Sequence, residues 1–283
     1  MRRLIVNGDD FGLAVPVNEA ICEAHCRGIL TTASLMVGGD AAADAVERSR
    51  RCPSLRVGLH LVLVEGRALL APQAIPALVD SQGRFSDSPA KAGFRYALRP
   101  GIRRQLAAEI RAQFEAFADT GLTLDHVDSH NHLHLHPRIF NLILDIGRDY
   151  GLAAVRVPCE PVLASWRASG KSLLPRATSR LLLYPLTAFM KRRLRRSGIR
   201  CNDHTFGMAD SGAMTGDLVV RILQHLPDGV TEMYFHPATR RCPEIDRTMP
   251  AYRHEEEFSA LTSPSMAQAF AASQIERIAF GDI

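Results

Sequence analysis

The stretch LIVNGDD, residues 4–10, is a short apolar run that ends in two adjacent carboxylates. Such a run is typical of a buried strand and of the turn at its carboxyl end. Similar β-rich runs alternate with amphipathic stretches along the rest of the chain. This alternation predicts an α/β fold in which parallel strands are connected by helices.

The periodicity of apolar residues locates the individual elements. The helix expected over 101–120 has the clearest pattern, since Ile102, Leu106 and Ile110 share one face and Gly121 follows as a C-cap. Further helices are expected at residues 16–28, 41–51, 138–151, 216–226, 253–262 and 265–274, and strands at 4–10, 32–39, 55–63, 122–137, 153–158, 203–207, 230–236 and 277–281.

Seven or eight strand–helix units over this length predict a (β/α) barrel-like fold, an incomplete or distorted TIM barrel. A doubly wound sheet is the alternative. With no internal repeat and no Gly/Ser linker, residues 1–283 are expected to form a single domain. Residues 64–100 are expected to form a long loop region over the barrel mouth.

Composition and cysteine usage limit the class of protein. At 283 residues and 46% hydrophobic composition, the chain can form a packed globular core. Its six cysteines are scattered without a CxxC pair, which favours reduced thiols over a disulfide framework or a structural zinc site. The N-terminal apolar run is too short for a signal-peptide core, and no run of about 18 apolar residues indicates a membrane span. These features predict a cytoplasmic protein.

The positive charge is concentrated in residues 161–202. This segment contains ten Lys and Arg side chains and no Asp or Glu between its end residues, whereas acidic residues outnumber basic ones elsewhere. Apolar side chains adjoin these cations, and the combination suits an amphipathic insertion that lies on anionic lipid at the inner face of a membrane. The membrane-facing candidates are Trp166, Leu182, Leu186, Phe189, Lys191, Arg192 and Arg193.

The basic segment also has other interpretations. A barrel helix with an apolar core face and a solvated basic face would have the same composition. Nucleic acid is disfavoured as a partner, because stacking aromatics are not interleaved with the cations and the acidic remainder would repel phosphate. Pro185 is expected to break any single long helix in this region.

Polar residues stand at the ends of several expected strands. Because the carboxyl ends of parallel strands converge on the active site of α/β proteins, these side chains are expected to meet in space. They are Asp9 and Asp10 on the first strand, His60 on the third, Asp128 and His130 on the fourth, Arg156 on the fifth and His236 on a later strand.

The fourth expected strand is unusual in its histidine content. LTLDHVDSHNHLHLHP, residues 122–137, contains five of the eleven histidines at alternate positions. A strand projects alternate side chains to one face, so an extended conformation would present a wall of imidazoles. Unpaired buried imidazoles are costly, and this wall would need partners or solvent. An exposed His-rich tract is the other interpretation.

A carboxylate and two imidazoles, with positions left for water and substrate, form a common site for a catalytic divalent metal. The candidate ligands are Asp10, His60 and His130. In the alternative interpretation Asp9 and Asp10 form a turn or cap the next helix, and His60 is an ordinary core histidine. Imidazole ligands suit zinc and a water-rich site suits magnesium, so one divalent ion is expected and its identity is left open.

Four ordered motifs resemble those of one known family. VNGDDFG at 6–12, GLHLVL at 58–63, DSHNHLHLHP at 128–137 and FHPA at 235–238 are similar to motifs of the YdjC family of carbohydrate deacetylases. The resemblance implies a (β/α) barrel-like fold, a divalent metal and hydrolysis of the acetyl group from an N-acetylhexosamine.

The resemblance also implies roles for individual residues. Carried over by motif, Asp10, His60 and His130 are the metal ligands, Asp9 is the catalytic base and His236 is the acid. Arg156 would hold Asp9 ionised and oriented, and a structural salt bridge is the alternative for it. The residues expected to orient ligands or contact the sugar are Asp128, His132, His134, Asp203 and His204, and for the last two a turn or capping role is the alternative.

Substrate and class alternatives stay open at this stage. The chain most resembles the hopanoid-associated branch of the family, which implies an N-acetylglucosaminyl glycolipid as substrate, and soluble chitooligosaccharide is the alternative. Metal-dependent phosphoesterases and amidohydrolases typically have an HxH motif near the first strand, where this chain has Asp9 and Asp10. A peripheral lipid-binding or metal-binding protein without catalysis is the non-enzymatic alternative. Formation of a homo-oligomer is left open.

Overall fold

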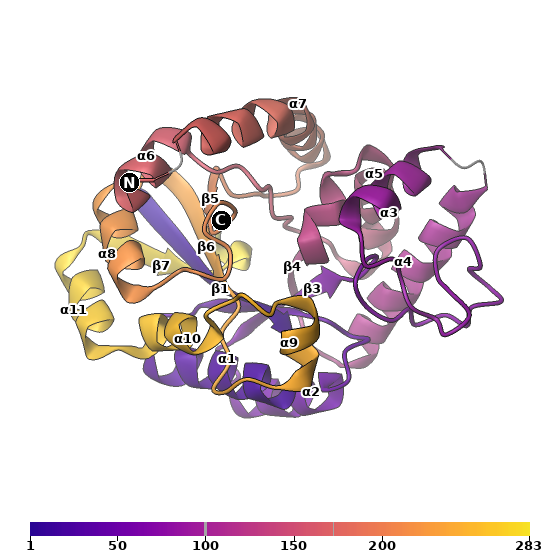
Figure 1. Ribbon diagram of the computed structural model, residues 1–283, viewed down its shortest axis with the longest axis horizontal. Helices are drawn as coiled ribbons and strands as arrows, with labels where there is room; N and C mark the ends of the chain where they lie inside the picture. The colour runs from indigo at the N-terminus through magenta and orange to yellow at the C-terminus, as the bar shows by residue number, and fades with distance from the viewer. Residues whose placement is uncertain (99–100, 172) are drawn as a thin grey trace.

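A curved sheet of parallel strands organises the chain (Figure 1). The computed structural model describes residues 1–98, 101–171 and 173–283. The strands are β1 (Arg2–Phe11), β2 (Thr32–Leu35), β3 (Arg56–Leu61), β4 (Leu124–Ser129), β5 (His204–Phe206), β6 (Gly229–Phe235) and β7 (Ile275–Ile278). Their order across the sheet is β4-β3-β2-β1-β6-β5, and β7 pairs with the first residues of β1.

The sheet curves into an incomplete barrel. From β1 to β4 the neighbours follow chain order, as in a (β/α) barrel, whereas a doubly wound sheet reverses at a switch point. Residues 153–158, expected as a strand, pair only through single bridges, from Val155 to Val127 of β4 and from Ala154 to Arg200. The barrel-like prediction is confirmed, and the gap between β4 and β5 is spanned by this irregular segment.

Helices cover the outside of the sheet, and Figure 1 shows them around its rim. They are α1 (Val15–Arg27), α2 (Ala42–Arg51), α3 (Pro89–Leu98), α4 (Ile102–Asp119), α5 (Pro137–Gly147), α6 (Val162–Ser169), α7 (Leu173–Ser197), α8 (Gly216–Gln224), α9 (Pro243–Thr248), α10 (His254–Thr262) and α11 (Pro264–Ala272). The apolar stripe that predicted α4 includes Leu106, Ile110 and Phe114, and all three side chains are buried. The helix α4 packs against α5.

The histidine-rich stretch is not one extended strand. β4 ends at Ser129, and residues His130–Leu135 form a tight 3-10 turn. Asn131 and His132 adopt left-handed backbone conformations, with φ of 53° and 51°. The expected wall of imidazoles is therefore wrong, because the backbone reverses after Ser129 and sends successive histidines into different surroundings.

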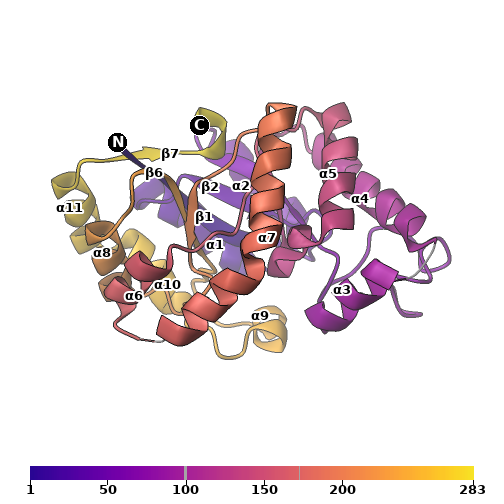
Figure 2. The same ribbon diagram turned by 90° about the horizontal axis from the view of Figure 1, so that it is seen from above.

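Pro185 does not break the helix of the basic segment. It lies inside α7, which runs for 25 residues. Its side chain faces solvent, and α7 changes direction part-way along its length (Figure 2). A proline inside a helix removes one backbone hydrogen bond and can bend the helix without ending it. The helix therefore bends where a break was expected. Within the described residues, no helix combines the length and the apolarity needed to cross a bilayer.

Candidate metal and catalytic site

A cavity of about 320 Å³ lies at the carboxyl ends of the strands. Its walls bring together side chains from β1, β3, β4, β6 and α9, and from the segments that follow β3, β4, β5 and β6. The lining residues are Asp9, His60, Glu65, Ser129, His130, Asn131, His132, Met208, Ser211, Tyr234, His236, Thr248, Met249 and Tyr252. The expectation that residues far apart in the sequence meet at the strand ends is met.

Asp10, His60 and His130 form the tightest donor cluster. Each offers one ligand atom, and the three atoms lie within 4.8 Å of one another. Asp10 Oδ1 is 3.4 Å from His60 Nε2 and 3.1 Å from His130 Nδ1. Asp10 takes a left-handed conformation, with φ of 62°, at the point where β1 bulges away from β2. This conformation is one that aspartate tolerates better than most residues.

The cluster fits a divalent cation. All three side chains are buried, and Asp10 Oδ2 has no hydrogen-bond partner among the residues that the structure describes. A buried carboxylate oxygen without a partner is costly unless an ion or water satisfies it. One carboxylate and two imidazoles are also ligands that zinc and related divalent metals accept.

The electrostatic field at this cluster attracts positive charge. Burial alone would lower the pKa of His60, but Asp128 and Asp10 raise it to about 10. Burial opposes the charged form of His130 as well, and Asp10 raises its pKa to about 9. Carboxylates that hold protons on two buried imidazoles would hold a cation in their place.

Outer partners fix the orientation of both imidazoles. His60 Nδ1 lies 2.7 Å from Asp128 Oδ1, which turns Nε2 toward Asp10. His130 Nε2 lies 3.5 Å from Glu65 Oε2, and Asn131 Nδ2 donates to the same oxygen at 2.9 Å. Carboxylates in these positions set the tautomer and the direction of a ligating histidine. Asp128, predicted to orient a ligand or contact the sugar, is hydrogen-bonded to His60.

A second donor group consists of Asp9, His60 and Asp128. It is less suited to a cation, because Arg156 already occupies both carboxylates. Arg156 Nη2 lies 2.7 Å from Asp9 Oδ1, and Nη1 lies 2.6 Å from Asp128 Oδ2. A guanidinium held at this distance would repel a metal ion on the same oxygens.

Arg156 is fully buried and contacts three carboxylates. Besides Asp9 and Asp128, its Nε donates to Glu232 at 2.8 and 3.0 Å. Burial works against its charge, but Asp128, Asp9 and Glu232 outweigh that effect and raise its pKa well above the ordinary value. Arg156 therefore stays charged and keeps Asp9 in one orientation beside the cavity.

His236 follows β6 and faces the same cavity. Its backbone N–H donates to Glu257 Oε2 at 2.6 Å, and its ring lies 5.0 Å from the ring of Tyr252. Burial lowers its pKa, and its Nδ1 has no partner within the described ranges. The free nitrogen leaves the ring available to a ligand in the cavity.

Two further histidines of the motif, His132 and His134, lie in different environments. His132 lines the cavity, with Nε2 3.1 Å from the hydroxyl of Tyr234, and burial lowers its pKa well below the ordinary value. His134 points away from the cavity and is held by Ser129 Oγ at 2.7 Å and by the carbonyl of Arg156 at 3.1 Å. His134 thus supports the turn and the position of Arg156.

Asp203 and His204 lie away from the cavity. Asp203 Oδ2 accepts from the backbone of Val230 at 2.9 Å, at the amino end of β6. Neither residue lines the strand-end cavity. Their position favours the turn and capping interpretation over a substrate contact.

Comparison with known proteins places the chain in a family. A model of the YdjC-like protein family matches residues 3–272. The chain belongs to the YdjC-like family. Over 280 residues it is 30% identical to a carbohydrate deacetylase of Geobacillus stearothermophilus, and the alignment covers 99% of this chain and 97% of the relative.

Other alignments of this YdjC-like protein are shorter or structural. A carbohydrate deacetylase of Brevibacillus brevis is 39% identical over 156 residues, which span 55% of the chain and 59% of that relative. The fold matches the crystal structure of a proposed cellobiose-phosphate cleavage protein from Enterococcus faecalis V583, with a TM-score of 0.78 and 22% identity. That match covers 99% of this chain and 98% of the other.

Several cavity and network residues of this YdjC-like protein escape sequence reasoning. Glu232 and Tyr234 lie two residues apart on β6 and are both buried. The sequence signal for a buried ion pair here was the presence of a Glu inside the apolar run GVTEMYF. Glu65 carries no comparable signal, since it lies in a loop and takes a left-handed conformation with φ of 53°. Tyr252 reaches the cavity from the segment before α10.

Proposed function

We propose that the protein is a metal-dependent hydrolase that removes the acetyl group from an N-acetylglucosamine-type sugar. The observation that carries the proposal is the unpartnered Oδ2 of Asp10, which is buried beside His60 and His130. Both of these histidines line the strand-end cavity together with Asp9. Similarity to carbohydrate deacetylases over nearly the whole chain supports the choice of substrate class.

Asp10, His60 and His130 would hold the cation. A divalent ion held there would supply Lewis acidity, which would polarise the amide carbonyl and lower the pKa of the attacking water. Zinc is favoured by the imidazoles, and magnesium is the second choice because most of its remaining ligands would be water.

The chain's own residues supply the proton transfers. Asp9 accepts a proton from the attacking water, and Arg156 with Asn7 holds its carboxylate in place, since Asn7 Nδ2 lies 2.5 Å from Asp9 Oδ1. His236 would donate a proton to the departing amine nitrogen, which would otherwise leave poorly. Because burial lowers the pKa of His236, that proton would be the one that Asp9 takes from the attacking water. His132 and Tyr234 line the side of the cavity where the sugar would lie.

Acetate release from N-acetylated glycans tests this proposal. Asp9→Asn should lower kcat by about 10²–10⁴-fold while the purified protein keeps its bound metal, because Asp9 removes a proton and is not a ligand. Asp10→Asn should lose both metal and activity. Equal metal loss in the two variants would contradict the division of roles between neighbouring aspartates.

For the substrate, we propose a glycolipid whose aglycone is a hopanoid, used at the inner face of the membrane. The exposed side of α6 and α7 supports membrane contact: Leu182 is 69% exposed, Trp166 is 37% exposed, and Arg192 is exposed. Phe189 is 36% exposed, although its ring also packs against the ring of Phe140 of α5, with a distance of 6.0 Å between centroids. Leu186, Lys191 and Arg193 are half-buried, so the proposed contact surface contains fewer residues than the candidate set.

Vesicle sedimentation tests the membrane contact. The protein should bind vesicles that contain phosphatidylglycerol more than vesicles of phosphatidylcholine alone, and Leu182→Asp together with Arg192→Glu should reduce that binding. Equal binding by the parent and this double variant would exclude the surface. Soluble chitooligosaccharide is the alternative substrate, and it is favoured if turnover of chitotriose exceeds turnover of the glycolipid.

A further inference from the structure

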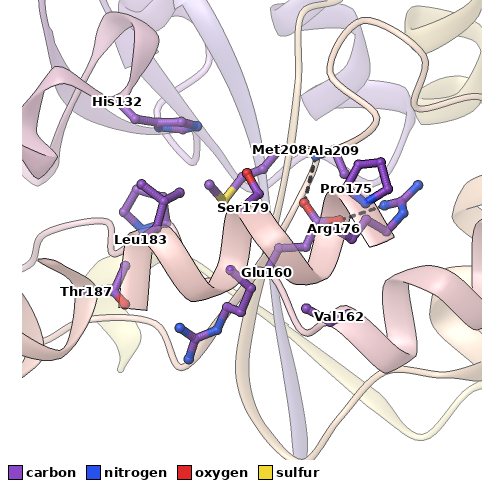
Figure 3. A pocket seen from close by; sticks show the side chains of 12 residues that line it. His132, Glu160, Val162, Pro175, Arg176, Ser179, Leu183, Thr187, Met208 and Ala209 are labelled. Carbon is purple, nitrogen blue, oxygen red and sulfur yellow. Dashed lines mark hydrogen bonds and ion pairs between the residues drawn. The ribbon is translucent and has the colours of Figure 1, made fainter. Parts of the chain in front are cut away.

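A second cavity, of about 330 Å³, lies next to the strand-end cavity and against α7 (Figure 3). Figure 3 shows His132 on one side of it and Leu183 of α7 on the other. His132 and Met208 line both cavities, so the two spaces share a wall. A ligand that occupied the first cavity could extend past these residues into the second.

One face of α7 forms the floor of the second cavity. Arg176, Ser179, Arg180, Leu183 and Thr187 all line it. Apart from the adjacent pair Ser179 and Arg180, they follow one another at intervals of three or four residues, which places them along a single side of the helix. By helical periodicity the exposed Leu181 and Leu182 of α7 project away from this face, so the floor is distinct from the surface around Leu182 that is proposed to contact the membrane.

The polar groups in this wall are largely satisfied by one another. Arg176 Nη1 lies 3.0 Å from Glu160 Oε1, and Glu160 Oε2 accepts from the backbone of Ala209 at 2.8 Å. The other arm of Arg176 lies 2.8 Å from Asp210. A sugar ring would bring several hydroxyl groups that need partners, and these paired side chains offer few.

What the wall presents to a ligand is mainly hydrocarbon. The apolar lining residues are Pro158, Val162, Pro175, Leu183, Met208 and Ala209. Arg180 contributes one buried donor, Nη1, that has no partner in the described part of the chain, while its guanidinium lies 4.9 Å from the ring of Tyr184. An apolar lining with one free donor, at this volume, is typical of a small-molecule site.

We infer that the second cavity binds the apolar aglycone of the substrate, an aliphatic or alicyclic group joined to the sugar through its glycosidic oxygen. The sugar amide lies in the strand-end cavity, and the aglycone passes His132 and Met208 to lie along α7. The free donor of Arg180 is available to an oxygen on that group. This inference rests on the proposed deacetylase function, and its test separates the two.

The test compares the methyl and octyl β-glycosides of N-acetylglucosamine. Each methylene removed from water favours binding by about fourfold, so the octyl glycoside should show a kcat/KM at least about tenfold above the methyl glycoside. Ser179→Trp fills the cavity and should bring the ratio to within about twofold. Ala177→Trp is the matched control, because Ala177 is on the same helix but does not line the cavity, and it should keep the parent ratio.

A second readout does not need catalysis. Calorimetry with chelator-treated protein should show tighter binding of the octyl than of the methyl glycoside, and Ser179→Trp should abolish the difference. If calorimetry gives this result but neither glycoside releases acetate, the cavity assignment stands and the proposed function fails. If both glycosides release acetate with equal kcat/KM, or if Ser179→Trp impairs chitotriose instead of the octyl glycoside, the aglycone assignment is overturned.

Discussion

Replacing Arg156 by methionine should destabilise the fold strongly. Its guanidinium is 0% exposed and lies within 3.0 Å of oxygens of Asp9, Asp128 and Glu232. Removing the cation leaves three buried carboxylates without a counter-charge. Breaking a buried ion pair by deleting one partner typically costs about 3–5 kcal/mol, and this site holds three such pairs. We therefore expect Arg156→Met to lower the free energy of unfolding by at least about 3 kcal/mol.

The destabilisation should depend on pH in a defined direction. Burial raises the pKa of Glu232 to about 7, although Arg156 lowers it, so deleting Arg156 raises that pKa further. A carboxyl group whose pKa is higher in the folded than in the unfolded state stabilises the folded state at low pH and loses that effect as pH rises. The difference in free energy of unfolding between the parent and Arg156→Met should be largest at pH 8 and should become smaller toward pH 5.

Urea unfolding followed by far-ultraviolet circular dichroism measures both effects. The midpoint and slope are compared for the parent, Arg156→Met and the double variant Arg156→Met with Glu232→Gln, which removes one uncompensated charge. The double variant should recover about 1–3 kcal/mol relative to Arg156→Met, because neighbouring groups in one network are strongly coupled. The reasoning would be refuted if Arg156→Met lowered the free energy of unfolding by less than about 1 kcal/mol, or if the double variant were no more stable than Arg156→Met.

Three further predictions follow from the geometry. Zinc at about 100 times its dissociation constant should stabilise the parent by about 2.7 kcal/mol and leave Asp10→Asn unchanged, as read from thermal unfolding with and without the ion. Burial raises the pKa of Glu257 to about 7. The stability that its protonated form contributes should therefore be complete below about pH 4.5 and should fall by about 3 kcal/mol as pH rises to 7. Urea midpoints measured across this pH range should vary less in Glu257→Gln than in the parent. Gly58→Ala should cost about 1–3 kcal/mol in urea unfolding, because its new methyl group would lie 2.4 Å from the ring of His126, and a neutral result would mean that the ring can move.

The sequence was informative wherever a pattern is local. The apolar stripe of α4 and the strand-to-helix alternation predicted most elements, and strand ends predicted that Asp10, His60 and His130 would meet. Parallel topology carries this inference, because it brings the carboxyl ends of separate strands to one edge.

The predictions that were wrong depended on backbone conformations that the residue pattern does not reveal. The alternate histidines matched a strand, but left-handed conformations at Asn131 and His132 end it, and a two-residue period cannot reveal such a turn. Pro185 matched a helix break, yet solvent on its side of α7 leaves room for a bend. Glu65 was missed because its approach to His130 depends on loop geometry.

The segment between Ala153 and Arg200 leaves the barrel and returns to the place where it began. Arg200 N–H donates to the carbonyl of Ala153 at 2.9 Å, and Val155 N–H donates to the carbonyl of Arg200 at 3.0 Å. A chain segment whose two ends are hydrogen-bonded to each other can become longer at a small cost in loop-closure entropy. That cost is about 0.6 kcal/mol for each doubling of the segment's length. The part of this segment that forms α6 and α7 could in this sense differ in length and sequence to suit a different molecule, while Arg156 and the aspartates and histidines on the strands keep their places.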